Sequence, residues 1–486
     1  MMEQVSREEV GLSMAVDFRG HKLFPPGFNS PTRFEGDVYD CEVWGEIPKD
    51  IEGTFYRMQC DFDYRPPANE WLTGFNGDGH ISRFRFANGS VDYKGRYVRT
   101  ERLMAERKAR KRLFGVYRNR FTDDPSVANI DRSAANTHTY WHGGKLFVLK
   151  EDSRAWHVDP HTLQTYGVWD FNGKYTAKTM SAHPKIDPMT GEMIAYGYQA
   201  KGDLTDDIAV YTINPAGQVV KEVWLKSPYL GIIHDIAITQ KYVIIPVIAR
   251  TTSLERLKSG EPMWEWNGSL PTMVGLLPRN GEAKDVRWYK GPSRNTLHFL
   301  NATDRKGAVT MELPTSSGER DPSQIRRWTF DLKSKKEDFK EEVVSVTPGI
   351  LPRMDDRFLS LDYRYAYLSS RDPNPDPNAK GPPLANLLQR LDVRTGDITQ
   401  CKVGPQQGLQ EACFVPRKNA QGEGDGYVMC IASNYESMSS DLVIADAQKM
   451  DQGIIATVKL PFRLRSGTHT NWYPQSALPP IKDELT

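Results

Sequence analysis

The chain has 486 residues, enough for two or three ordinary domains or for one large repetitive β architecture. Its 63 basic and 62 acidic residues nearly cancel, so no overall field favours a nucleic acid or an anionic membrane as a partner. Five cysteines in no C-x-x-C pair argue against a disulfide framework and a thiolate metal site, and favour a reducing compartment.

The sequence predicts no targeting signal and no membrane span. The N-terminal MMEQVSREEVGLS lacks the apolar core of a signal peptide, and the longest apolar run, YVIIPVIA (242–249), is too short to span a bilayer. The tail IKDELT contains KDEL followed by Thr486, whereas a retention signal must be terminal. We expect a soluble, cytoplasmic protein with no integral membrane segment, as a monomer or homodimer.

Short β-rich runs dominate the sequence, and long helical periodicities are scarce. The clearest runs cover residues 145–151, 192–200, 242–249, 426–433 and 441–447. The basic run ERKARKR (106–112) has helical character, and we interpret it as a solvated helix face rather than as a weak site for an anionic surface. The Pro-rich segment 372–386 predicts a surface loop.

A turn opened by Asp or Asn recurs between these runs, at Asp159, Asp187, Asn214, Asp331 and Asp392. Each such turn follows one strand and leads to another, as in the four-stranded blades of a propeller. Successive turns are 27 to 117 residues apart, which excludes a strict repeat such as WD40. We therefore predict an all-β fold, a single β-propeller domain over 1–486 with long inserted loops, in preference to a sandwich.

Four of the ten histidines lie in distinctive contexts: MSAHPKID (His183), GIIHDIAI (His234), NTLHFLNA (His298) and SGTHTNWY (His469). They are separated by at least 51 residues, so each would come from a different blade and could meet the others on the propeller axis. We interpret His21, His138, His142, His157 and His161 as surface or structural residues, while His80 is ambiguous.

Four neutral imidazoles suit a first-row metal, and open coordination positions suit Fe(II) that handles O₂. A zinc hydrolase is the competing interpretation, although the sequence has neither H-E-x-x-H nor H-x-H.

These segments, in this order, resemble the four iron-binding segments of the carotenoid cleavage oxygenases. Other blocks match the same family: FNGDGHISRFRF (75–86), YVRTER (97–102), EACFVPR (411–417) and EGDGYV (423–428). The resemblance implies a seven-bladed β-propeller with a cap of loops and short helices over an axial Fe(II). It implies that His183, His234, His298 and His469 bind the iron.

Within the family the sequence resembles the aromatic branch, which contains the lignostilbene and resveratrol dioxygenases and the isoeugenol- and vinylphenol-cleaving enzymes. Segments 106–127, 252–262 and 460–465 carry this resemblance. It implies that Phe75, Tyr117 and Lys150 surround the phenol ring of the substrate. Lys150 ends an apolar run, where an inward-pointing lysine needs a partner.

The family also implies glutamates that orient the histidines: Glu151 near His234 and Glu411 near His469. At the third position, ahead of Pro-Arg in ILPRMDDRF, this protein has Ile350.

We expect an Fe(II)-dependent dioxygenase that uses O₂ to cleave the alkene double bond of a small phenolic alkene, with an aromatic aldehyde such as vanillin as a product. Isoeugenol, 4-vinylguaiacol, coniferyl alcohol and hydroxystilbenes such as resveratrol are the candidates, with a slight preference for the smaller set. An apocarotenoid oxygenase is the alternative within the family, disfavoured by the mean hydropathy of −0.57. A non-catalytic propeller scaffold is the alternative outside it and predicts no bound iron.

Overall fold

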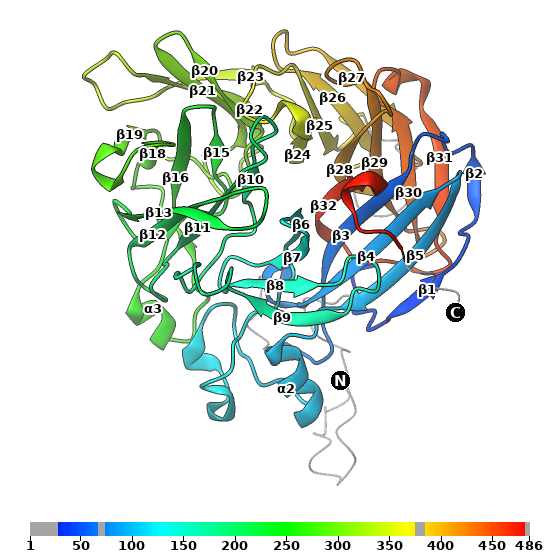
Figure 1. The fold of residues 1–486 in the computed structure, drawn as a ribbon, viewed down its shortest axis with the longest axis horizontal. Coiled ribbons are helices and arrows are strands. Elements are labelled where there is room, and N and C mark those ends of the chain that lie inside the picture. Colours follow the sequence, from blue (N-terminus) through cyan, green and yellow to red (C-terminus); the bar gives the residue numbers. More distant parts are fainter. Residues whose placement is uncertain (1–27, 67–72, 375–383, 482–486) are drawn as a thin grey trace.

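The strands form seven antiparallel sheets arranged around a central axis (Figure 1), so the predicted seven-bladed β-propeller is confirmed. The computed structural model describes residues 28–66, 73–374 and 384–481, and every element below lies in these ranges. The N-terminal stretch, most of the Pro-rich segment 372–386 and nearly all of IKDELT lie outside the described residues.

Four blades are simple four-stranded meanders. From the inner to the outer strand they are β6 (His138–His142), β7 (Lys145–Leu149), β8 (Ala155–Val158) and β9 (Thr165–Trp169); β10 (Lys185–Ile186), β11 (Met193–Tyr198), β12 (Asp207–Ile213) and β13 (Val219–Lys226); β20 (Asn301–Arg305), β21 (Ala308–Thr315), β22 (Gln324–Asp331) and β23 (Lys340–Ser345); and β24 (Ile350–Met354), β25 (Tyr365–Ser370), β26 (Leu387–Asp392) and β27 (Ile398–Lys402).

A fifth blade is larger because its long central strand pairs with several short ones. It contains β14 (Gly231–Ile232), β15 (Ala237–Ile238), β16 (Tyr242–Thr251), β17 (Glu265–Trp266), β18 (Thr272–Pro278) and β19 (Arg287–Gly291).

The remaining two blades combine strands from both ends of the sequence, and this closes the ring. One is ordered β32 (Gly467–Pro474), β3 (Gly53–Asp61), β4 (Asp78–Ala87), β5 (Ser90–Tyr97) and β1 (Gly36–Val38); the other is ordered β28 (Gln407–Pro416), β29 (Gly426–Asn434), β30 (Ser439–Asp446), β31 (Ile454–Lys459) and β2 (Val43–Gly45). The C-terminal strand is thereby the inner strand of the N-terminal blade. Its hydrogen bonds to β3 hold the ring closed.

The predicted turns connect neighbouring strands of the blades. Between β10 and β11, the Asp187 carboxylate accepts a hydrogen bond from the Met189 N–H at 2.9 Å, and its carbonyl accepts one from the Gly191 N–H at 2.8 Å. Gly191 has φ +69°, a left-handed conformation that glycine adopts without a steric penalty. Asp392 and Gly396 repeat this arrangement between β26 and β27.

The core lies between adjacent blades. Phe55 and Phe84 of the N-terminal blade pack with Met429 and Ile444 of the blade beside it, and all four are buried. The five cysteines are buried and free, as predicted from the absence of paired spacings.

Short helices and loops cover one side of the ring. They include α1 (Thr73–Asn76), α2 (Glu101–Ala109), η1 (Arg120–Thr122), η2 (Pro125–Val127) and α3 (Leu254–Lys258); single 3-10 turns elsewhere are η3 (Ala283–Asp285), η4 (Asp356–Phe358), η5 (Met450–Gln452) and η6 (Gln475–Ala477). The Thr100 hydroxyl caps α2, whose buried face carries Arg102, Leu103 and Glu106, while residues 108–111 of the basic run are exposed. No helix within the described ranges is long and apolar enough to cross a membrane.

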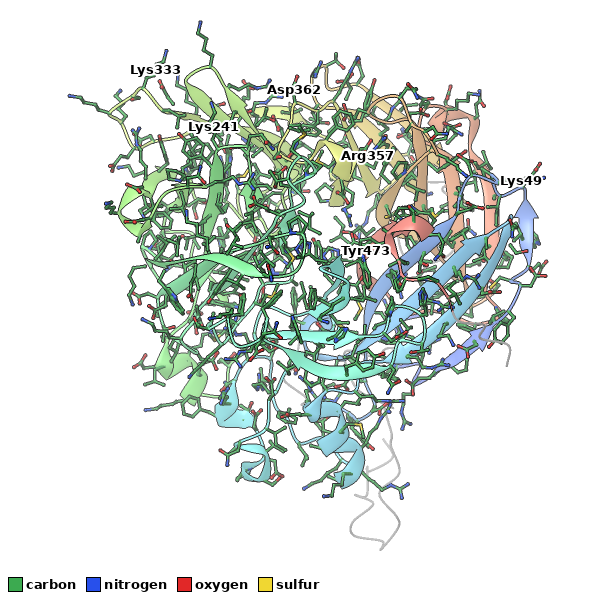
Figure 2. The ribbon with its side chains drawn as sticks, in the orientation of Figure 1. Lys49, Lys241, Lys333, Arg357, Asp362 and Tyr473 are labelled. Carbon is green, nitrogen blue, oxygen red and sulfur yellow. The ribbon has the colours of Figure 1, made fainter. Side chains whose placement is uncertain are left out.

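A cavity of about 440 Å³ follows the axis. Arg357 and Tyr473, labelled near the axis in Figure 2, line it, together with the apolar side chains of Ile186, Leu300 and Phe414. Three of the four histidines singled out above, His183, His298 and His469, also line this cavity. The cavity therefore reaches the histidine cluster.

Candidate metal centre

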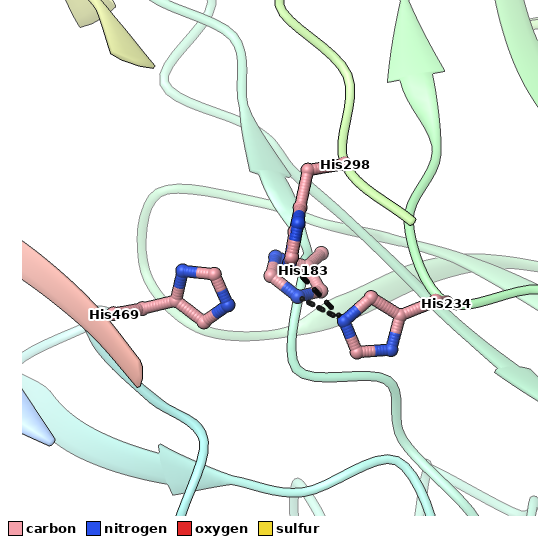
Figure 3. Close-up of side chains that lie close together, drawn as sticks. All are labelled: His183, His234, His298 and His469. Carbon is pink, nitrogen blue, oxygen red and sulfur yellow. Dashed lines mark hydrogen bonds between the residues drawn. The ribbon is translucent and has the colours of Figure 1, made fainter. Parts of the chain in front are cut away.

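Four inner strands deliver the four histidines to one point on the axis. His183 precedes β10, His234 follows β14, His298 precedes β20 and His469 lies in β32. Their ligand nitrogens all lie within 4.8 Å of one another. The Nε2 atom of His234 is 3.1 Å from that of His183 and 3.3 Å from that of His298 (Figure 3).

The tautomers of two of these imidazoles are set by buried carboxylates. His234 Nδ1 donates to Glu151 Oε2 at 2.6 Å, and His469 Nδ1 donates to Glu411 Oε1 at 2.7 Å. Because a carboxylate only accepts, Nδ1 carries a proton in both rings, which leaves Nε2 as the atom that would bind a metal. Burial, followed by the neighbouring imidazoles, holds the pKa of His183 and of His298 well below the usual value, so both rings are neutral.

The donor set and its spacing fit a divalent first-row metal. Two nitrogens bound to one ion at about 2.1 Å and at a right angle are about 3 Å apart, close to the two Nε2 separations observed. Neutral imidazoles are ligands for iron, zinc, copper and nickel. The cluster is therefore a site that could hold a metal ion.

The two carboxylates are supported differently. Burial would raise the pKa of Glu151, but His234, the Arg118 charge and the Tyr117 hydroxyl outweigh it and lower the value to about 2. Glu411 Oε2 instead accepts from Arg353 Nη1 at 3.1 Å and from the Thr470 N–H and Oγ1. Sequence reasoning missed Arg353, although it belongs to the quoted Pro-Arg pair.

His298 differs from His234 and His469. Within 28–66, 73–374 and 384–481 no carboxylate accepts a hydrogen bond from it, in keeping with Ile350 at the position where the family resemblance implies glutamate. Two of the four imidazoles are thus oriented by glutamates.

The three residues expected around a phenol ring lie together beside His234. Phe75 is in α1, Tyr117 is in the loop between α2 and η1, and Lys150 directly follows β7. The rings of Phe75 and Tyr117 are 5.6 Å apart, and Phe75 is 6.2 Å from the His234 ring. Lys150 Nζ lies 4.6 Å from the centre of the Tyr117 ring and donates to the Phe75 carbonyl at 2.6 Å.

Neighbouring side chains hold this group in place. Arg118, buried and at φ 51°, donates to the Tyr198 hydroxyl at 3.2 Å and to Gln199 Oε1 at 3.1 Å. Asn119 Nδ2 donates to the carbonyls of Leu257 and Glu261, which ties the same loop to α3. The two residues after Tyr117 therefore anchor its loop on two sides.

His138 lies in the interior rather than at the surface. It is only 3 % exposed and begins β6, and its ring centre is 4.7 Å from that of His469. Its Nδ1 donates to the Ala182 carbonyl at 3.1 Å, so the residue supports the strand that leads to His183. Its sequence context, polar and without an apolar run, contained no signal for this position.

Comparisons with known proteins agree over nearly the whole length of the protein. The family model described as RPE65, retinal pigment epithelial membrane protein, matches residues 29–474. Carotenoid cleavage oxygenase 1 of Neurospora crassa is 41% identical over 481 residues, covering 93% of this protein and 90% of that one. Isoeugenol monooxygenase of Pseudomonas putida is 40% identical over 460 residues, covering 91% and 96%.

A solved structure, the lignostilbene dioxygenase of Pseudomonas brassicacearum, superposes with a TM-score of 0.90 at 38% identity. The match covers 95% of this protein and 100% of that structure. The protein has four histidines on the axis of its propeller, and oxygenases of one family match it over nearly its whole length. It is therefore an oxygenase of the RPE65/carotenoid cleavage oxygenase family.

Proposed function

We propose that the protein is an Fe(II)-dependent dioxygenase that cleaves the alkene double bond of 4-hydroxyphenyl alkenes. The observation that carries this proposal is the position of Lys150, Tyr117 and Phe75 against His234. The three side chains contribute an ammonium group, a hydroxyl and an aromatic face, and the Phe75 ring centre lies 6.2 Å from that of His234, a candidate metal ligand. The names of the isoeugenol and lignostilbene relatives support the same class of substrate.

Iron held by His183, His234, His298 and His469 would supply the spin and electron change that O₂ needs in order to react with an alkene. The protein's own residues supply orientation and charge. Phe75 and Tyr117 would pack against the phenol ring, and Lys150 would donate to its oxygen. Lys150 is 1 % exposed, so its charge acts in a medium of low dielectric constant, where it stabilises a phenolate more strongly than in water.

A phenol that approaches its ionised form donates electron density through the ring to the conjugated alkene, which makes the outer alkene carbon reactive towards oxygen. Cleavage then gives each alkene carbon one oxygen atom. The atoms and electrons of the alkene and one O₂ balance in two carbonyl products, so no further reductant is required. Isoeugenol would yield vanillin and acetaldehyde.

The test is anaerobic loading with Fe(II), followed by oxygen uptake with isoeugenol and with resveratrol. We expect one O₂ per alkene cleaved and no cleavage of the 4-O-methyl ether of isoeugenol. One relative is named a monooxygenase and the other a dioxygenase, so the number of O₂ atoms that enter the products has to be measured. ¹⁸O₂ labelling measures it, with immediate reduction of the aldehydes so that their oxygen does not exchange with water. Label in both products supports a dioxygenase, whereas label in one product, or equal cleavage of the ether, contradicts the proposal.

A further inference from the structure

One carboxylate joins the phenol-binding residues to the metal cluster. Glu151 Oε2 accepts from His234 Nδ1 at 2.6 Å, and Glu151 Oε1 accepts from the Tyr117 hydroxyl at 2.7 Å. Tyr117 and Glu151 are each 2 % exposed, so water does not compete for these hydrogen bonds. Tyr117, Glu151 and His234 are therefore linked by two consecutive buried hydrogen bonds.

The direction of these hydrogen bonds limits what Tyr117 can recognise. A carboxylate only accepts, so the single hydroxyl proton of Tyr117 is committed to Glu151. The Tyr117 oxygen can then only accept from a substrate. The Lys150 ammonium has three donors, one of which is used by the Phe75 carbonyl, and no acceptor. A group that satisfies both residues must donate and accept, which a hydroxyl does and a methyl ether does not.

We propose that Glu151 couples the phenol-binding residues to the metal cluster: when the substrate 4-hydroxyl donates a hydrogen bond to the Tyr117 oxygen, Glu151 transmits that contact to His234. This inference rests on the proposed phenolic substrate. Consecutive hydrogen bonds polarise one another, so a phenol that donates to Tyr117 strengthens the donation from Tyr117 to Glu151. The carboxylate then holds the His234 N–H less strongly, and the ligand field of a metal in the cluster changes. The coupling is reciprocal, so a metal bound in the cluster also changes the affinity of the protein for the phenol.

The second glutamate provides an internal contrast. Glu411 Oε2 is occupied by Arg353 Nη1 and by the backbone and hydroxyl of Thr470. None of these partners belongs to the phenol-binding group, so within the described residues the His469 side of the cluster has no corresponding link. The coupling is confined to His234.

The experiment uses Co(II)-loaded protein, whose visible spectrum reports on the metal ligands. The probes are 2-methoxy-4-propylphenol, which resembles isoeugenol but has no alkene, and its methyl ether. In the unaltered protein we expect the phenol to shift the Co(II) bands and to bind more tightly than the ether, which leaves the bands unchanged. No shift with the phenol, or an equal shift with the ether, overturns the proposal without recourse to any variant.

The variant Tyr117→Phe should keep its metal, lose the shift, and lose up to about tenfold of the preference for the phenol, as one neutral hydrogen bond allows. Tyr196→Phe is the matched control, because the Tyr196 hydroxyl is also buried and donates to the His234 carbonyl at 2.7 Å. It should keep both the shift and the preference. If Tyr117→Phe retains both with full metal content, the coupling is refuted while phenolic cleavage stands. If the unaltered protein binds neither probe, the proposed substrate class itself fails.

Discussion

Replacing Lys150 by methionine removes one charge from the proposed phenol-binding group of Phe75, Tyr117 and Lys150, and keeps nearly the same side-chain volume. The ammonium is buried and donates to the Phe75 carbonyl at 2.6 Å. That carbonyl also accepts from Asn136 Nδ2 at 3.2 Å, so it keeps a hydrogen bond in the variant. Lys150 makes no hydrogen bond to the four histidines in the described structure. We therefore expect the folded variant to retain its metal.

The expected loss is in the chemical step. A neutral phenol would lose one hydrogen bond from a charged donor, worth about 1.5–3 kcal/mol. The developing phenolate would in addition lose its counter-charge, and positioned acid–base groups of this kind contribute about 10²–10⁴-fold. At about 1.36 kcal/mol for each factor of ten, the barrier should rise by about 2.7–5.4 kcal/mol. kcat/KM for isoeugenol should fall accordingly.

The assay compares kcat/KM, iron per polypeptide and thermal midpoint for the unaltered protein and Lys150→Met. Lys145→Met is the matched control, because Lys145 is the first residue of β7, the strand that Lys150 follows. Its Nζ lies 4.5 Å from the centre of the Trp169 ring, away from Phe75 and Tyr117. The control should change kcat/KM by less than about twofold, as expected for a site outside the machinery. A Lys150→Met protein with full iron and kcat/KM within about threefold of the unaltered protein would refute the phenolate argument, since acid–base assistance of this kind is larger.

Further changes test the metal centre, the charge state and ring closure. Glu411→Gln keeps the shape but loses the charge that orients His469, so metal affinity measured by chelator competition should fall about 10–100-fold; equal affinity contradicts that role. His469→Ala should lose bound metal, as measured by elemental analysis, and full metal content would remove it from the ligand set. Burial lowers the pKa of Lys150 from its ordinary value of 10.5. If activity requires the charged ammonium, kcat/KM should therefore begin to decline with rising pH before pH 10.5 is reached. A value of kcat/KM that stays constant up to that pH would contradict a role for the charged form. Trp472→Ala removes a ring of β32, the closing strand, whose centre lies 5.8 Å from that of the Phe86 ring in β4. The free energy of unfolding, measured with denaturant, should fall by about 3 kcal/mol. A fall of less than about 1 kcal/mol would show that this ring contributes little to ring closure.

Much of the fold was predictable because its signals are local. A turn such as that at Asp187 depends on a carboxylate that bonds to its own backbone two residues on, and such a rule can be applied without knowing the rest of the sequence. The β-rich runs 145–151, 242–249 and 426–433 correspond to β7, β16 and β29 within a few residues. The larger blade containing β16 was not predicted, since its extra pairings join segments that local patterns do not connect.

The candidate site was predictable in part. His183, His234, His298 and His469 could be selected from their contexts and the resemblance, but their meeting depends on β32 entering the N-terminal blade. Arg353 and Arg118 were not singled out, and His138 was predicted only as a surface or structural residue, because nothing in their immediate sequence distinguishes a buried, bonded side chain from an exposed one. Burial is a property of distant neighbours.

The sequence alone determined a β-rich protein with recurrent Asp- or Asn-opened turns, four separated histidines, and a set of motifs that places it near oxygenases. Only the tertiary structure decided that Tyr117 and His234, 117 residues apart in the sequence, share the carboxylate of Glu151. Local rules act over a few residues through the backbone, whereas a shared carboxylate requires three segments to arrive together in a space that excludes water. The ring of blades provides that arrangement, because it carries each inner strand to the same axis.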